Sequence, residues 1–258
     1  MLPGLDPARA LPHDYPDAVL VGRAWLPGAG PAVVLLDGDE VRDLSALAPT
    51  MSQLLERPAA ADEIRAAGRP PAIGSVRDIL ANSAHDARDA GTPWFLAPCD
   101  LQAVKASGVT FVASLLERVI EEQARGDSAR AADLRSSITS VIGDNLQAIR
   151  PGSDEAARLK EVLIGRGAWS QYLEVGIGPD AEIFTKAPPM SAVGTGAEVG
   201  IHPRSAWNNP EPEVVLAVNS RGEVVGAALG NDVNLRDFEG RSALLLGKAK
   251  DNNASCAI

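Results

Sequence analysis

The stretch NNPEPEVVLAV at residues 208–218 sets two acidic side chains at the start of an apolar, strand-like run. Residues two apart in a strand point to the same side, so Glu211 and Glu213 would project together. Two close carboxylates raise each other's pKa unless a cation lies between them. Mg²⁺ takes oxygen ligands of this kind. The pair therefore suggests a metal site, and the alternative is an exposed strand end with two solvated glutamates.

Two downstream stretches add candidate groups to this pair. Residues 230–239, GNDVNLRDFE, follow a strand-like run at 224–229. If that strand returns antiparallel, Asp232 comes near the two glutamates. The alternative is a polar turn followed by a capped helix. Residues 246–256, LGKAKDNNASC, carry Lys248 and Lys250 in what reads as a polar loop, where lysines are normally solvated.

The N-terminal part of the chain has a β-rich pattern. Apolar runs at 18–25 and 31–36 are separated by the turn PGAG at 27–30, and Asp37-Gly38 predicts a hairpin into 40–44. Residues 50–66 and 75–82 predict short helices. The polar stretch 83–93 predicts a linker, which divides the chain into domains at 1–92 and 93–258.

The middle of the chain is helical and the later part is strand-rich. Residues 112–135 have a helical apolar stripe interrupted near 126–128, and a second helical stretch runs from 133 to 149. Ser153 is a plausible cap for a third helix that ends at 165–167. Strand-like runs follow at 182–186, 213–218 and 224–229. Helices followed by strands predict an α+β fold.

The bulk composition limits the classes of partner. The 258 residues are 45% hydrophobic, and the net charge of −10 disfavours nucleic acid and anionic membranes as partners. Cys99 and Cys256 form no CxxC pair, so neither a disulfide framework nor a zinc knuckle is indicated. We expect a cytoplasmic protein in which an anionic substrate is held by a local metal ion or lysine.

These motifs together resemble the fumarylacetoacetate hydrolase superfamily. The Glu-x-Glu strand, the Asn-Asp-Val-x-x-Arg-Asp segment and a lysine six residues before a cysteine occur in the family's order. EIFTKAP at 182–188 is similar to the family's phenylalanine–lysine–proline strand. SGVTF at 107–111 lies where the family has its first active-site loop. The resemblance covers roughly residues 95–258.

The resemblance implies a metal centre. The family's metal ligands fall on Glu211, Glu213 and Asp232, and the implied ion is Mg²⁺, with Mn²⁺ or Ca²⁺ possible. The family's active-site lysine falls on Lys250, by its spacing to Cys256.

Further site residues follow from the same resemblance. Arg236, Lys186 and Thr110 are expected to contact substrate, and Glu117 is a second catalytic candidate beside Lys250. Hydrolytic family members have a histidine and a glutamate just after the first loop. Here Ser114 occupies the histidine's place, so the general base for C–C hydrolysis is missing.

The helical insertion and the Trp-Asn-Asn-Pro-Glu-Pro-Glu stretch resemble the family branch that dehydrates 2-keto-3-deoxy-pentonates to 2-oxoglutarate semialdehyde. This implies a magnesium-dependent hydro-lyase of pentose catabolism. One alternative is a hydrolase of acylpyruvates or diketo acids. A second alternative is an inactive truncated fragment.

The implied architecture is a small N-terminal β-rich domain followed by a mostly β, rolled mixed sheet with a helical insertion. Family members continue beyond the Ser-Cys-Ala-Ile at 255–258, so we expect the sheet to be incomplete at the C-terminus. The family implies a homodimer or homotetramer that acts on a small sugar acid and has no nucleic-acid or membrane partner.

Overall fold

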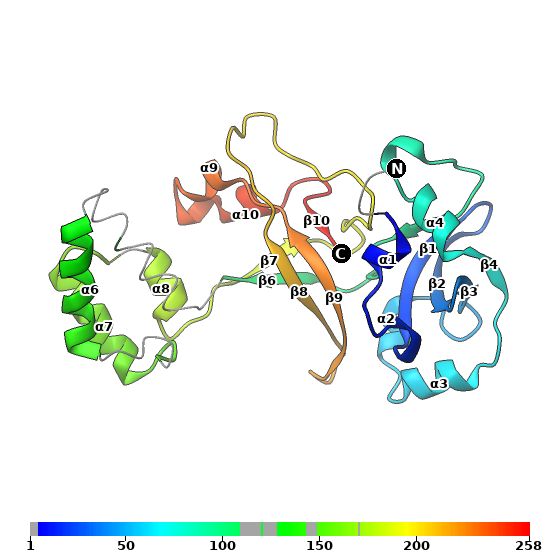
Figure 1. Ribbon diagram of the computed structural model, residues 1–258, viewed down its shortest axis with the longest axis horizontal. Helices are drawn as coiled ribbons and strands as arrows, with labels where there is room; N and C mark the ends of the chain where they lie inside the picture. Colours follow the sequence, from blue (N-terminus) through cyan, green and yellow to red (C-terminus); the bar gives the residue numbers. More distant parts are fainter. Residues whose placement is uncertain (1–4, 109–119, 121–127, 143–148, 170) are drawn as a thin grey trace. The chain divides into compact units, whose positions relative to one another are not determined.

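The computed structural model describes residues 5–108, 120, 128–142, 149–169 and 171–258. The chain divides into two units, one made of Met1–Val104 together with Thr185–Ile258 and the other of Lys105–Phe184. Figure 1 shows the elements of both, and each unit is described by itself.

A five-stranded antiparallel sheet forms the N-terminal part of the first unit, in the order β4-β3-β2-β1-β5. Gly28 and Gly38 have positive φ, of 79° and 59°, in the two tight turns. Glycine adopts this conformation without steric cost. The strands and hairpins predicted between 18 and 44 are confirmed. The strands are β1 Leu20–Leu26, β2 Gly30–Asp37, β3 Glu40–Asp43, β4 Ala72–Ser75 and β5 Trp94–Leu96.

Both faces of this sheet are covered, because adjacent residues of β2 belong to different cores. Val33 packs with residues of α2 (Met51–Leu55) and α3 (Ala60–Ala66). Val34 packs with residues of α4 (Val76–Asn82). Thr50 and Ser75 cap α2 and α4 through their side-chain oxygens. The predicted helices at 50–66 and 75–82 are confirmed, the first as two short helices.

The predicted linker at 83–93 leads into a strand of the same sheet. β5 pairs with β1 through Arg23 and Leu96, so the N-terminal sheet includes residues beyond 92. The domain boundary at 92 stays a prediction. The two compact units divide the chain after Val104 and after Phe184. The short helices of this region are α1 Pro7–Ala10, η1 Tyr15–Asp17 and η2 His85–Ala87.

A second antiparallel sheet in the same unit has the order β10-β9-β8. Its strands are β8 Pro212–Val218, β9 Val224–Asp232 and β10 Cys256–Ala257, so the predicted strands at 213–218 and 224–229 are confirmed. An isolated parallel bridge joins Val193 to Ala257. Antiparallel and parallel neighbours together give a small mixed sheet, and the predicted α+β class is confirmed.

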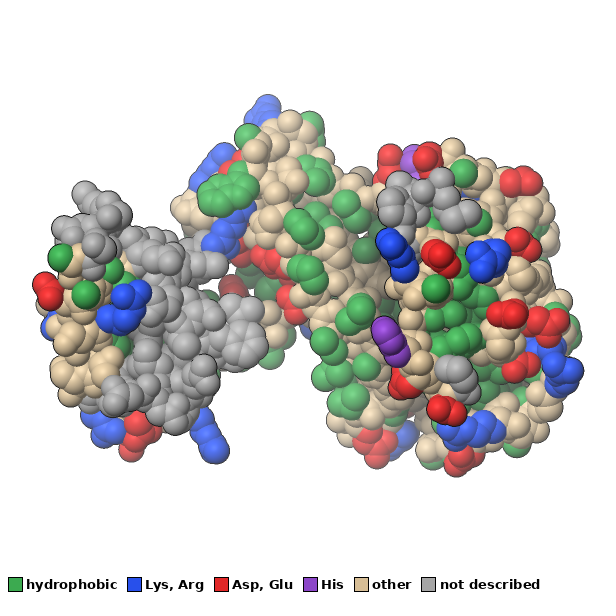
Figure 2. Space-filling view, in the orientation of Figure 1, with side chains coloured by type: hydrophobic (Ala, Val, Ile, Leu, Met, Phe, Trp, Pro, Cys, Tyr) green, Lys and Arg blue, Asp and Glu red, His purple; other side chains and the backbone are tan. Residues whose placement is uncertain are grey.

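The β8–β9 hairpin exposes much of its apolar surface. Val214 and Leu229 face each other across the two strands and are 68% and 78% exposed. Leu216 and Val218 are also exposed. Figure 2 shows hydrophobic side chains at the surface over this hairpin.

The second unit is helical. α6 (Ser128–Ile142), α7 (Asp154–Gly165) and α8 (Gln171–Ile177) surround a core that includes Leu159, Leu163 and Leu173. Ser153 caps α7 by accepting a hydrogen bond from the Ala156 amide, as predicted. α6 begins at the predicted interruption near 126–128. Most of the predicted stripe at 112–127 lies outside the described residues.

The remaining elements are β6 Val104–Ser107 and β7 Ile183–Ala187, which pair with each other, and α9 Arg236–Glu239, η4 Ala243–Leu245 and α10 Leu246–Lys250. The strand predicted at 182–186 is confirmed as β7. In the described part of the chain, every helix is too short or too polar to cross a lipid bilayer.

Candidate metal centre

The β8–β9 register brings three acidic side chains together. Glu213 lies opposite Gly230, and the Asp232 amide donates to the Glu211 carbonyl at 2.9 Å. The start of β8 and the end of β9 are therefore side by side. Oxygens of Glu211, Glu213 and Asp232 all lie within 4.8 Å of one another. The antiparallel return expected from the sequence does bring these three residues to one place.

Lys250 joins this acidic cluster from α10. Its Nζ donates to Glu211 Oε2 at 2.5 Å and to Asp232 Oδ2 at 3.2 Å, and the side chain is almost fully buried. Burial alone would lower the Lys250 pKa. The Glu211 hydrogen bond and the charges of Asp232, Glu211 and Glu239 outweigh burial, and the pKa is raised above its ordinary value. Lys250 is therefore a cation near neutral pH.

The expectation that Lys248 and Lys250 lie in a polar loop was wrong. Both lie in the short helix α10, and only Lys250 turns into the cluster. Lys248 is exposed, and its Nζ lies 5.1 Å from the centre of the Phe238 ring. The helix is tied to the segment after β9 by the Leu235 amide, which donates to the Ala249 carbonyl.

Glu213 is the least compensated acid of the group. Burial raises its pKa, and the negative charges of Asp232 and Glu211 raise it further, while Lys250 acts in the opposite direction. Among the described residues, Glu213 makes no side-chain hydrogen bond or ion pair. The cluster therefore retains a carboxylate that would gain from a second nearby cation.

Two polar residues that the sequence did not single out support the cluster. Asn234 is fully buried, and its Nδ2 donates to Glu211 Oε1 at 3.0 Å and to Glu239 Oε2 at 2.8 Å. Its Oδ1 is buried without a hydrogen-bond partner in the described structure. Both residues lie in the quoted 230–239 stretch. The sequence pointed to Asn234 and Glu239 only through their spacing of five residues, which is a weak indication of a shared site.

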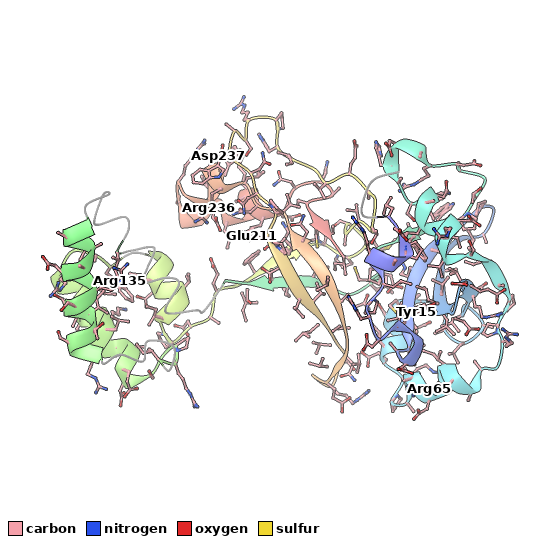
Figure 3. All side chains as sticks on the ribbon, viewed as in Figure 1. Tyr15, Arg65, Arg135, Glu211, Arg236 and Asp237 are labelled. Carbon is pink, nitrogen blue, oxygen red and sulfur yellow. The ribbon has the colours of Figure 1, made fainter. Side chains whose placement is uncertain are left out.

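Arg236 lies at the start of α9 and donates to Glu239 Oε2 at 2.7 Å. Glu211 and Arg236 are in the same region of the molecule, around α9 and the start of β8 (Figure 3). The substrate contact expected for Arg236 stays a prediction. Thr110 and Glu117 lie outside the described residues.

Lys186 of β7 lies behind the cluster and is 1% exposed. Its Nζ is 2.8 Å from Asp232 Oδ1 and donates to the Val233 carbonyl at 2.8 Å. It also donates to the Lys250 carbonyl. The structure thus brings Lys186, Lys250 and Asp232 into direct contact.

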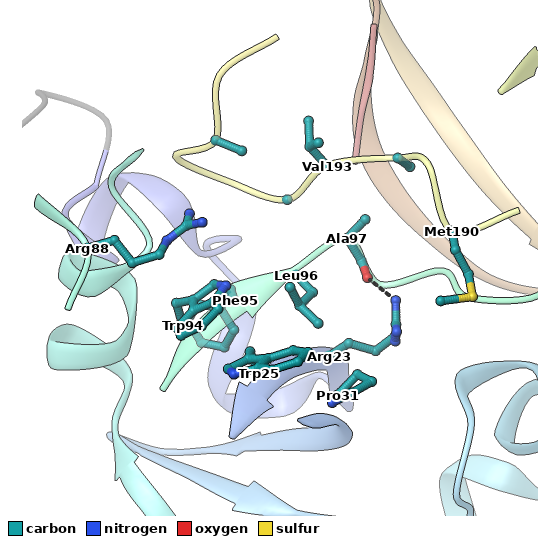
Figure 4. A pocket seen from close by; sticks show the side chains of 13 residues that line it. Arg23, Trp25, Pro31, Arg88, Trp94, Phe95, Leu96, Ala97, Met190 and Val193 are labelled. Carbon is teal, nitrogen blue, oxygen red and sulfur yellow. Dashed lines mark hydrogen bonds between the residues drawn. The ribbon is translucent and has the colours of Figure 1, made fainter. Parts of the chain in front are cut away.

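A separate cavity of about 250 Å³ lies against the N-terminal sheet. Trp25 and Trp94 stack at its wall with ring centres 5.6 Å apart, and Arg88 lies over the Trp94 ring (Figure 4). Arg23 donates to the Ala97 carbonyl there. Aliphatic and aromatic side chains line this cavity together with two arginines, whereas those of the acidic cluster are mostly carboxylates.

Comparison with known proteins gives consistent relatives. The chain is 39% identical over 87 residues to a probable 2-keto-3-deoxyxylonate dehydratase of Haloferax volcanii, which covers 34% of this chain and 30% of that protein. It is 37% identical over 77 residues to the 2-dehydro-3-deoxy-D-arabinonate dehydratase of Saccharolobus solfataricus, covering 30% of this chain and 26% of that protein. No family model matches the chain.

Solved structures of similar fold belong to the same kind of enzyme. A 2-keto-3-deoxy-D-arabinonate dehydratase complexed with magnesium and 2,5-dioxopentanoate matches with a TM-score of 0.52 and 20% identity, over 92% of this chain and 63% of that chain. Its apo form matches with a TM-score of 0.53 and 19% identity over the same shares. The chain thus spans less than two thirds of each of these relatives. Over about a third of its length the chain is similar in sequence to 2-keto-3-deoxy-pentonate dehydratases, and it has the α+β fold of these solved structures.

Proposed function

We propose that this chain carries the metal site of a hydro-lyase that dehydrates a 2-keto-3-deoxy-pentonate to 2-oxoglutarate semialdehyde. The observation that carries the proposal is the convergence of Glu211, Glu213 and Asp232 beside the buried Lys250. The names of the relatives agree with this chemistry, and a solved structure of similar fold is complexed with magnesium and 2,5-dioxopentanoate.

The three carboxylates fit a hard divalent cation. All the donors are oxygens, and the Glu213 pKa is raised by burial and then by the charges of Asp232 and Glu211, which Lys250 only partly offsets. Mg²⁺ prefers a few carboxylates and keeps waters on its other positions. Glu211, Glu213 and Asp232 would hold the ion, which when bound supplies Lewis-acid polarisation of the substrate's keto and carboxylate oxygens.

Lys250 fits the role of a positive group that faces developing negative charge. Its raised pKa keeps the ammonium protonated, so it can donate a hydrogen bond to the C2 oxygen as the C3 proton leaves. Lys250 is the second candidate, after Glu117, for the group that removes the C3 proton. Glu117 remains the predicted base. The C4 hydroxyl then departs as water, and the remaining enol rearranges to the semialdehyde.

The hydrolase alternative shares the metal site and differs in its products. A hydrolase consumes water and releases two carboxylic or carbonyl fragments, whereas a dehydratase releases water and keeps all five carbons. Product analysis by mass spectrometry therefore separates the two. A homodimer or homotetramer stays a prediction, which light scattering of the purified chain tests.

The test uses the full chain with Mg²⁺ and the xylonate- and arabinonate-derived substrates. Semialdehyde is followed through an NAD-dependent aldehyde dehydrogenase. We expect Glu213→Ala to lower kcat/KM at least about 100-fold and to abolish measurable Mn²⁺ binding by electron paramagnetic resonance. The control is Glu198→Ala, since Glu198 is exposed and pairs only with His85 among the described residues. Full activity in Glu213→Ala would contradict the proposed metal site.

A further inference from the structure

The Lys186 ammonium has more contacts than it has hydrogens. A lysine donates three hydrogen bonds. Lys186 Nζ contacts the carbonyls of Val233 and Lys250, a carboxylate oxygen of Asp232, and Ser255 Oγ at 3.4 Å. All donors are therefore used inside the protein, and no donor is left for a substrate.

These contacts join Lys186 to three places that lie 47, 64 and 69 residues later in the chain. Val233 follows the end of β9, Lys250 ends α10, and Ser255 directly precedes β10. Lys186 itself lies in β7. The Ser255 hydroxyl also donates to the Lys250 carbonyl at 2.7 Å. One buried charge thus fixes the ends of the two segments that supply Asp232 and Lys250 to the acidic cluster.

The two oxygens of Asp232 have different cationic neighbours. Oδ1 forms an ion pair with Lys186 at 2.8 Å, outside hydrogen-bond geometry, and Oδ2 accepts a hydrogen bond from Lys250 at 3.2 Å. Asp232 is 6% exposed, so its carboxylate is held by these two ammonium groups with little help from water. Lys186 thus holds Oδ1 on one side of the carboxylate, while Oδ2 lies toward Lys250 on the other.

We infer that Lys186 is a positioning residue of the metal centre: it orients the Asp232 carboxylate and anchors the Lys250 backbone, in place of the substrate contact that the sequence suggested. The inference rests on the proposed function. Groups that orient metal ligands typically change metal affinity about 10- to 100-fold when removed. Lys186 is expected to act in the same way.

The test compares Lys186→Met with the wild-type chain. Methionine has a similar length and removes the charge. We expect the Kd for Mn²⁺, measured by calorimetry without substrate, to rise about 10- to 100-fold. The electron paramagnetic resonance spectrum of bound Mn²⁺ should broaden as the site becomes less uniform. At saturating metal, the KM for substrate should change less than about threefold, because Lys186 does not touch substrate.

The control is Lys248→Met, which makes the same chemical change at an exposed lysine over the Phe238 ring. Its Mn²⁺ affinity should equal that of the wild type. An unchanged Kd in Lys186→Met, or a raised KM with normal metal binding, would overturn the inference. If the wild-type chain itself binds no Mn²⁺, it is the proposed function that fails.

A second variant covers the case in which Lys186→Met does not fold. Ser255→Ala keeps the charge and removes the hydroxyl that links the Lys186 ammonium to the Lys250 carbonyl. The hydroxyl donates to the Lys250 carbonyl and accepts from the Lys186 ammonium and the Asn252 amide, so its loss should raise the Mn²⁺ Kd by about threefold. An Mn²⁺ Kd equal to that of the wild type would then count against the inference.

Discussion

The N-terminal sheet and the β8–β9 sheet use similar aliphatic sequences in opposite ways. In the first, helices cover both faces, and Val33, Val34 and Leu54 are essentially inaccessible to solvent. In the second, Leu216 and Leu229 remain largely exposed. Its polar end, by contrast, is buried, with Asp232, Asn234 and Lys250 each less than a tenth exposed.

The difference separates what stabilises the chain from what it can bind. Apolar burial stabilises the N-terminal sheet, at about 25 cal/mol per Å² removed from water. At the end of the second sheet, desolvated charges are balanced against one another instead. A buried ion pair contributes little net stability, because desolvation offsets the attraction. The carboxylate cluster is therefore better understood as a binding feature than as a stabilising one.

The largest expected effect is in the N-terminal core. Leu54→Ala should lower the free energy of unfolding by about 2–5 kcal/mol, because it leaves a cavity in a fully buried cluster. Urea denaturation followed by circular dichroism measures this. Leu216→Ala, on the exposed face, should change it by less than about 0.5 kcal/mol. Equal losses in the two variants would show that the exposed face is covered in solution.

An intermediate effect is expected at Asp100. Its carboxylate accepts hydrogen bonds from the amides of Met51, Ser52 and Leu101 and from the Ser52 hydroxyl. Asp100→Ala leaves these donors without their acceptor and should cost about 2–3 kcal/mol. Chemical denaturation at pH 7 measures the loss.

The same residue predicts a pH dependence. Burial alone would raise the Asp100 pKa, but the hydrogen bonds from Ser52, Leu101 and Met51 outweigh it and hold the pKa below its ordinary value of 3.8. A lowered folded-state pKa means that the contribution is present above pH 3.8 and disappears as the pH falls through the folded-state value. The stability difference between wild type and Asp100→Ala should therefore shrink on acidification, and a constant difference would contradict this account.

The smallest expected change in stability is for alanine substitutions at two glycines of β9. A Cβ at Gly230 would lie 2.6 Å from Val215 Cγ2 and 3.1 Å from the Ala257 carbonyl oxygen, whereas at Gly226 the nearest atom is 3.8 Å away. Gly230→Ala should cost about 1–2 kcal/mol through overpacking, and Gly226→Ala should be close to neutral. Thermal unfolding compares them. A neutral Gly230→Ala would mean that the Val215 side chain and β10 both shift at no cost.

Local patterns predicted much of the fold. The turn glycines at 28 and 38 and the serine cap at 153 act through neighbouring residues, so their signals are contained in short windows of sequence. The pairing of β5 with β1 could not be predicted in this way. Its partners lie about seventy residues apart, and three residues of strand carry too little pattern of their own.

In the candidate site too, features set by local sequence were predicted, and features set by long-range contacts were not. The approach of Glu211 and Glu213 to Asp232 follows from a single hairpin, and the sequence indicated it. The resemblance picked out Lys250, but its burial depends on α10 turning back onto Leu235. The contacts of Lys186 span 64 residues and involve backbone carbonyls, which any residue type can supply. No side-chain pattern can encode such partners.

Cys256 sits directly opposite Asp232 in the β9–β10 pairing. Burial raises the pKa of its thiol to about 11, so roughly one molecule in ten thousand carries a thiolate at pH 7. An alkylating reagent can therefore modify this sulfur at an appreciable rate only after β10 separates from β9. The rate of Cys256 alkylation therefore reports how often β10 opens beside the carboxylates. Mass spectrometry of samples taken at successive times would measure that rate.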